Sequence, residues 1–232
     1  MGLSRQRKSL SPYGVARRLF NAAAAALLGV AVMALSATAS AANGPVRVLA
    51  LGDSLTAGYG LGDGQGFVPQ LERALRAKGY DVTVINAGVS GDTTAGGLSR
   101  LDWALGDKPD VALVELGAND MLRGLDPAAA RANLDAILGR LKERNIPTLL
   151  AGMYASASYG RAYTERFNAI YPELAAKHGV PLYPFFLDGV ATDAAMNQGD
   201  GIHPNAAGVK VIVERILPHV TRLLDNRART GG

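Results

Sequence analysis

The sequence predicts a three-layer α/β/α domain built around a five-stranded parallel sheet. From residue 46 onward, short apolar segments alternate with segments in which apolar residues recur every three or four positions. Such alternation is typical of parallel strands joined by crossover helices. The strand segments are continuously apolar, which indicates that both faces of the sheet are buried. About 190 residues follow the N-terminal segment, enough for one well-buried domain over residues 43–232.

Each element follows from a local pattern. The strand segments are short, apolar and bounded by polar residues, glycine or proline; they are 46–51, 82–85, 111–116, 148–152 and 180–183. Helices are predicted where apolar residues keep helical spacing; they begin near Phe67, include Leu98–Leu105, begin at Pro127, cover about 161–178 and begin at Pro204. Trp103 is interpreted as a core residue, and His178 and His219 as ordinary residues at helix ends.

Residues 1–42 are predicted to be a secretory signal peptide. Basic residues precede an apolar stretch from Ala22 to Leu35, and small residues follow it at 37–42, which is the order of an n-region, an h-region and a cleavage site. The apolar stretch is shorter than the roughly 20 residues of a spanning helix, so no stable membrane anchor is expected after cleavage. The chain is expected to be periplasmic or secreted. A partial twin-arginine pattern at Arg17 and Arg18 leaves the Sec and Tat routes open.

The net positive charge of the chain comes from this N-terminal segment. Five of the 24 basic residues and none of the 20 acidic residues precede Asn43, so the remaining domain is close to neutral and lacks the basic footprint of a nucleic-acid-binding protein. The chain has no cysteine, so no disulfides support it after export. No cluster of His and carboxylate residues has metal-ligand spacing. We expect a monomer that binds neither metal nor nucleic acid.

Polar residues with catalytic potential follow the predicted strands. Ser54 lies in a glycine-rich stretch, residues 52–60, directly after the first strand, and the segments 86–93, 117–120 and 200–205 follow later strands. The carboxyl ends of parallel strands meet along one edge of a sheet, so we expect these loops to converge. Taken singly, each has an ordinary interpretation, such as a helix cap for Ser54 or a simple turn at 117–120.

Together these residues have the composition of an acyl-transfer site. Ser54 is a weak nucleophile until a base takes its proton, and His203 is the best-placed imidazole. The base needs a partner on its second ring nitrogen, and Asp200 can reach it from three residues earlier in the same loop. The sequence therefore predicts a serine nucleophile activated by a histidine and an aspartate.

A tetrahedral intermediate also needs preorganised donors for its oxyanion. The side-chain amide of Asn119 and the backbone N–H of Ser54 can supply two of them. A glycine N–H from the segment after the second strand can supply a third. The residues alone do not choose between Gly88 and Gly91 for this role.

Four motifs resemble those of the GDSL, or SGNH, hydrolases. They are GDSLTAGYG at 52–60, SGDT at 90–93, GAND at 117–120 and DGIHPN at 200–205. The similarity covers essentially the whole chain after the signal peptide, and it is strongest to the exported subgroup of thioesterases, arylesterases and lysophospholipases. Ala118 stands where a glycine is common in the family, which is tolerated if the backbone there is not left-handed.

The resemblance implies a flavodoxin-like fold, no cofactor and a defined set of site residues. It implies Ser54 as the nucleophile, His203 as the base and Asp200 as the partner of that base. It also places Gly91, rather than Gly88, in the oxyanion hole with Asn119 and the Ser54 N–H.

The activity implied is that of a serine ester hydrolase. It would cleave carboxylic esters and thioesters through an acyl-enzyme on Ser54, and its expected substrate is a small acyl ester or a lysophospholipid. Apolar residues near the motifs are expected to line a groove for the acyl chain; they are Met121, Leu122, Leu125, Met153 and Tyr154. Two alternatives stay open, a carbohydrate O-acetylesterase with a small polar acyl pocket and a non-catalytic binding module.

Overall fold

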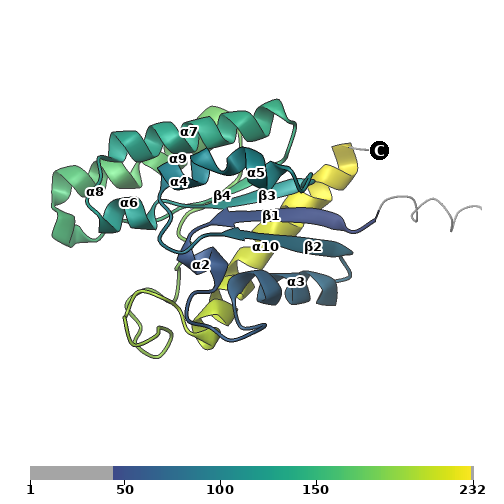
Figure 1. The fold of residues 1–232 in the computed structure, drawn as a ribbon, viewed down its shortest axis with the longest axis horizontal. Helices are drawn as coiled ribbons and strands as arrows, with labels where there is room; N and C mark the ends of the chain where they lie inside the picture. Colours follow the sequence, from purple (N-terminus) through teal and green to yellow (C-terminus); the bar gives the residue numbers. More distant parts are fainter. Residues whose placement is uncertain (1–43, 231–232) are drawn as a thin grey trace, which may run out of the picture. The chain divides into compact units, whose positions relative to one another are not determined.

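A five-stranded parallel sheet forms the middle layer of the molecule (Figure 1). The computed structural model describes residues 44–230, and the predicted signal peptide lies outside them. The strands are β1 (Val46–Gly52), β2 (Val82–Gly88), β3 (Val111–Glu115), β4 (Thr148–Ala151) and β5 (Leu182–Tyr183). All neighbours pair in parallel, in the order β2-β1-β3-β4-β5. This is the flavodoxin-like order, so the predicted fold class is confirmed.

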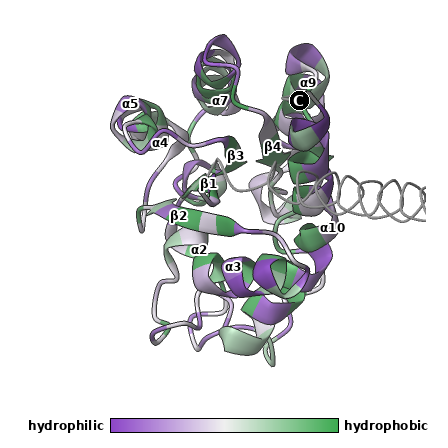
Figure 2. Ribbon diagram, turned by 90° about the vertical axis from the view of Figure 1, so that its right-hand side faces the viewer, coloured by the Kyte–Doolittle hydropathy of each residue, from purple (hydrophilic) through white to green (hydrophobic). Residues whose placement is uncertain are grey.

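Helices cover both faces of the sheet. One layer holds α3 (Phe67–Ala77) and α10 (Ala206–Thr230), and the other holds α4 (Thr94–Ser99), α5 (Leu101–Leu105), α7 (Pro127–Glu143) and α9 (Ile170–His178), as Figures 1 and 2 show. The remaining helices, α2 (Ser54–Ala57), α6 (Ala118–Leu122), α8 (Arg161–Asn168) and the 3-10 turn η1 (Ala157–Tyr159), lie near the carboxyl ends of the strands. Right-handed crossovers in this strand order require that division into two layers.

The core lies on both sides of the central strands. β3 and β4 are entirely buried, and Figure 2 shows both strands as strongly hydrophobic. Leu49 and Leu51 of β1 pack there together with Phe67 and Leu71 of α3, all at most 1% exposed. Burial of this continuous apolar sheet fixes the strand ends, and the strand ends position the loops that follow them.

The two ends of the described chain lie away from those loops. Val46 begins β1 and Ser54 follows its other end, while α10 runs back along the sheet so that its last turn lies near the start of β1 in Figure 1. The four motifs therefore lie at the carboxyl ends of the strands, and the two ends of the described chain lie at the opposite side of the sheet, near the start of β1.

Two helices predicted as continuous are each divided. The segment 161–178 breaks at Ala169 between α8 and α9, because Pro172 lacks the N–H that would continue the hydrogen-bond ladder across this point. The second predicted helix is α4 followed by α5, with Arg100 ending one and beginning the other.

Three further predictions need correction. Trp103 is 76% exposed rather than in the core, because it lies on the outer side of the five-residue helix α5. The last helix begins at Ala206 and not at Pro204, since the Asn205 side chain accepts hydrogen bonds from the N–H groups two and three residues later and so caps the helix. His219 lies inside α10, which continues through Pro218, and its ring packs edge-on against Tyr183.

The fifth strand is shorter than predicted. It contains only Leu182 and Tyr183, because Pro181 has no N–H to donate to a neighbouring strand. None of the helices within residues 44–230 is long and apolar enough to cross a bilayer.

Candidate active site

Ser54, His203 and Asp200 form a hydrogen-bonded chain at the carboxyl edge of the sheet. His203 Nε2 lies 2.9 Å from Ser54 Oγ, and His203 Nδ1 lies 2.6 Å from Asp200 Oδ2. With the Nδ1–H donated to Asp200, Nε2 is left as the acceptor for the Ser54 hydroxyl proton. The geometry is that of a nucleophile, a general base and an orienting carboxylate.

The turn after β1 places Ser54 at the start of a short helix. Asp53 caps the short helix α2 by accepting a hydrogen bond from the Leu55 N–H at 3.0 Å, and Ser54 is the first residue of that helix. A side chain at Gly52 would overlap Thr56 Oγ1, which is only 2.0 Å from the position of its Cβ. Glycine at 52 is thus needed for the helix to begin directly at the end of the strand.

The loop that carries His203 is built around Asp200. One carboxylate oxygen of Asp200 accepts hydrogen bonds from the N–H groups of Ile202 and His203, both at 3.0 Å, while the other binds the imidazole. These bonds, that from the imidazole first, lower the pKa of Asp200 to about 2, so this carboxyl stays ionised across the physiological range. The Tyr59 ring packs against the imidazole with centroids 4.6 Å apart and restrains its orientation.

The structure separates the two candidate glycine donors. The N–H of Gly88 donates to Asn86 Oδ1 at 3.0 Å, and a Cβ at Gly88 would lie 2.3 Å from the backbone N of Ala57. Gly88 is therefore a packing residue of β2. Gly91 lines the same cavity as Ser54, and its N–H has no acceptor among residues 44–230. Of the two glycine N–H groups, that of Gly91 is therefore the one open to a ligand, and its role in the oxyanion hole stays a prediction.

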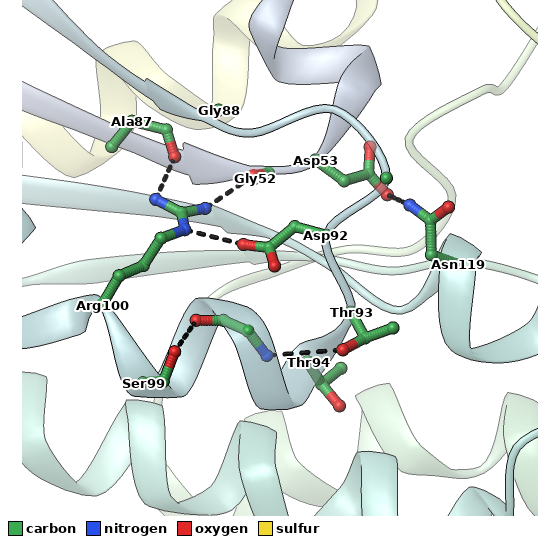
Figure 3. A network of polar contacts seen from close by, with 12 residues as sticks. Gly52, Asp53, Ala87, Gly88, Asp92, Thr93, Thr94, Ser99, Arg100 and Asn119 are labelled. Carbon is green, nitrogen blue, oxygen red and sulfur yellow. Dashed lines mark hydrogen bonds and ion pairs between the residues drawn. The ribbon is translucent and has the colours of Figure 1, made fainter.

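Asn119 reaches the site from the first turn of α6. Gly117 precedes this helix with φ +118°, and Ala118 is an ordinary helical residue, so alanine is tolerated at this position as expected. The Asn119 side chain donates from Nδ2 to Asp53 Oδ2 at 3.1 Å (Figure 3). That bond fixes which end of the amide carries the N–H groups and leaves a second N–H on Nδ2 for a ligand.

Two buried carboxyl groups lie behind the nucleophile. Asp53 and Glu115 are both completely buried, and Glu115 Oε2 accepts a hydrogen bond from Thr56 Oγ1 at 2.8 Å. Burial raises the pKa of Asp53 to about 6 and, together with the nearby Asp53 charge, raises the pKa of Glu115 well above its ordinary value. Burial beside Asp53 therefore favours the neutral form of Glu115.

An apolar cavity of about 520 Å³ opens beside Ser54 and His203. Met121, Leu122, Met153 and Tyr154 line it, as do further apolar residues that were not predicted: Leu55, Tyr59, Phe185, Leu187 and Ile202. Leu125 lies outside the lining and is 41% exposed. Its N–H donates to Asp120 O where the chain turns after α6, and this turn carries Leu125 away from the cavity.

Comparison with known proteins agrees with this geometry. The sequence profile of the GDSL-like lipase/acylhydrolase family matches residues 50–211. The chain belongs to this family. As a family member it is a carboxylic ester hydrolase, and the resemblance carried by the four motifs is confirmed.

Among residues 44–230, no group of three or more His, Asp or Glu side chains is arranged to hold a metal ion.

Similar proteins match this hydrolase over most of their length. Esterase TesA of Pseudomonas aeruginosa is 41% identical, with 76% of this chain and 89% of the relative covered. Thioesterase 1/protease 1/lysophospholipase L1 of Escherichia coli K12 is 43% identical, with coverage of 68% and 75%. The crystal structure of AlinE4, an SGNH-hydrolase family esterase, superposes with a TM-score of 0.67 at 49% identity, over 78% of this chain and 98% of that structure.

Several residues that shape the site of this hydrolase carried no sequence signal of their own. Asp53 and Tyr59 lie within the first motif, but their contacts with Asn119 and His203 depend on the folded loops. Gln198 is similar: its Nε2 binds Tyr59 O at 2.8 Å and thereby joins the histidine loop to the nucleophile loop. Only Glu115, a carboxylic residue inside an otherwise apolar strand segment, could have been noticed from the pattern.

Proposed function

We propose that this chain is a serine ester hydrolase in which Ser54 attacks the acyl carbonyl. His203 takes the Ser54 proton and later gives it to the leaving alcohol or thiol, while Asp200 holds the imidazole and stabilises its charged form. The oxyanion would accept hydrogen bonds from the N–H groups of Ser54 and Gly91 and from Asn119 Nδ2. The observation that carries this proposal is the continuous chain from Ser54 Oγ through His203 to Asp200.

The apolar cavity supports acyl chains longer than acetyl as substrates. A volume of about 520 Å³ lies within the range of pockets that enclose whole small molecules, and most of the surface that lines it is apolar. The names of the relatives, a thioesterase and a lysophospholipase among them, agree with esters and thioesters of fatty acids. Export to the periplasm or medium, where a lysophospholipid is a suitable substrate, stays a prediction, as does a monomeric state.

Hydrolysis of p-nitrophenyl esters from acetyl to palmitoyl tests this function. We expect turnover by residues 43–232 to be highest for a medium or long chain and to be lost in Ser54→Ala. Ser99→Ala is the matched control, because Ser99 is exposed, lies outside the cavity lining and donates from Oγ to Gly96 O within its own helix, and it should retain activity. Turnover confined to acetyl would favour the O-acetylesterase alternative. Turnover that survives Ser54→Ala would refute the assigned nucleophile.

A further inference from the structure

Arg100 joins three points of the active-site framework that are far apart in the sequence (Figure 3). Its Nη2 donates to Gly52 O at 2.9 Å, its Nη1 to Ala87 O at 2.7 Å, and its Nε binds Asp92 Oδ2 at 2.7 Å. The Arg100 and Asp92 side chains are 17% and 13% exposed. The guanidinium is thus held in one place by all three partners, away from most of the solvent.

The three partners flank the two backbone segments on which the oxyanion hole depends. Gly52 is the last residue of β1 and lies two residues before Ser54, while Ala87 lies near the end of β2. Asp92 directly follows Gly91. A single side chain from the junction between α4 and α5 therefore links the nucleophile turn to both ends of the loop that carries the Gly91 N–H.

That loop has few other restraints. Val89 and Ser90 are exposed, and Gly91 has φ +80°. The Val89 N–H donates to Gly52 O, the same carbonyl that Arg100 binds, and Arg123 binds the Gly91 carbonyl. Packing therefore contributes little to the position of the Gly91 N–H, and polar contacts set it.

We infer that Arg100, paired with Asp92, is a positioning residue that sets the placement of the Gly91 N–H relative to Ser54 Oγ. The inference rests on the proposed function, in which that N–H binds the oxyanion. Arginine suits this task because its planar fork satisfies three acceptors in fixed directions, whereas a lysine ammonium is a compact charge on a flexible stem. Arg100 touches neither substrate nor the reacting atoms.

The test is Arg100→Lys, with Arg76→Lys as the matched control. Arg76 also binds a strand carbonyl through its fork, donating to Val82 O from Nε at 3.0 Å and Nη2 at 2.9 Å, and it pairs with Glu72. Val82 is the first residue of β2, so this contact lies at the amino end of the strand, whereas the site lies at the carboxyl end. The two substitutions remove similar contacts, but only Arg100→Lys releases the oxyanion loop.

We expect Arg100→Lys to lower kcat by roughly 10- to 100-fold with KM changed less than about threefold, because a misplaced donor weakens binding of the transition state alone. Inhibition by an alkyl trifluoromethyl ketone, whose adduct with Ser54 bears an oxyanion, should weaken by the same factor as kcat/KM. Arg76→Lys should leave both quantities unchanged. Thermal unfolding shows that each variant is folded at the assay temperature.

Asp92→Asn provides a second variant that removes the ion pair while leaving Arg100 its two carbonyl contacts. It should lower kcat in the same selective way, by a smaller factor. The inference is overturned if folded Arg100→Lys and Asp92→Asn keep the wild-type kcat, or if Arg76→Lys lowers kcat equally. Failure of the proposed function would instead be seen in the Ser54→Ala variant retaining turnover, whatever the Arg100 variants do.

Discussion

Asp53 binds Asn119, and its substitution by asparagine is expected to lower activity while raising stability. Asp53→Asn keeps the size of the side chain, and its Oδ1 can still accept the capping hydrogen bond from Leu55 N–H. Its Oδ2, however, is replaced by an NH2 group that faces Asn119 Nδ2. Two donors cannot pair, so the Asn119 amide must rotate and place its carbonyl oxygen where the N–H groups were.

The activity cost follows from the loss of one oxyanion donor. Removal of such a donor typically lowers kcat by about 10²–10³-fold, or about 3–4 kcal/mol in the barrier. A change in KM is not expected, because the apolar residues that line the acyl cavity keep their places. Asp53→Asn should therefore lower kcat selectively.

The effect on stability has the opposite sign. The pKa of Asp53 is raised from 3.8 to about 6 by burial, so between these values the folded state binds more protons than the unfolded state, and stability falls as pH rises through this window. The difference corresponds to a penalty of up to about 3 kcal/mol above pH 6. The carboxamide introduced by Asp53→Asn is neutral and avoids this penalty, so the variant should be more stable than the wild type at pH 8 and equal to it near pH 4.

Urea unfolding at pH 4, 6 and 8, alongside ester hydrolysis, tests both effects. Asp126→Asn is the control, because Asp126 caps α7 through Ala128 N–H in the same way but is exposed and pairs with Arg166 rather than Asn119. The pKa of Asp126 is lowered, chiefly by that backbone hydrogen bond, so its substitution should not stabilise the fold and should leave kcat unchanged. A wild-type kcat in Asp53→Asn would refute the orienting role, and reduced stability at pH 8 would refute the buried-charge penalty.

Three further predictions concern the same framework. Glu115→Gln should keep kcat within about threefold, because burial raises the pKa of Glu115 and so favours its neutral form, which the carboxamide resembles. In unfolding experiments from pH 5 upward, only the wild type should show the loss of stability due to Glu115, and a similar loss in the variant would contradict this. Gly117→Ala should destabilise the fold by about 2 kcal/mol or more, measured by denaturant unfolding, since φ is +118° and the new Cβ would lie 2.2 Å from Tyr171 Oη; a neutral effect would mean that the turn rearranges freely. Asp200→Asn should lower kcat less than His203→Ala, because Asp200 orients the base without accepting the substrate proton; equal losses would mean that the two roles are wrongly assigned.

The sequence predicted the site residues that belong to motifs lying directly after strands. Ser54, Asn119 and His203 lie on loops that parallel strands bring to one edge, so their convergence follows from the alternation of elements. The contacts of Arg100 could not be predicted in this way, because its three acceptors lie 8, 13 and 48 residues away in the chain. Their meeting depends on the folded positions of β1, β2 and the junction between α4 and α5.

The errors in the fold prediction have local causes. Periodicity identified the helical segment around Trp103, but a helix of five residues shows too little of the pattern to reveal which side faces the core. Proline at 204 is a usual first helical residue, yet Asn205 supplies the cap and moves the start. Side-chain hydrogen bonds to backbone decide such boundaries, and apolar spacing does not report them.

The opposite placement of the catalytic loops and the chain ends matters for use of the enzyme on a solid support. β1 has seven residues, so its first and last residues are separated by roughly 20 Å of extended backbone, and Ser54 follows the last. A linker attached before Val46 would hold the protein with the mouth of the cavity turned toward the bulk solution. Immobilised or displayed forms tethered there should retain access to bulky ester substrates, whereas tethers within residues 185–203 would obstruct it.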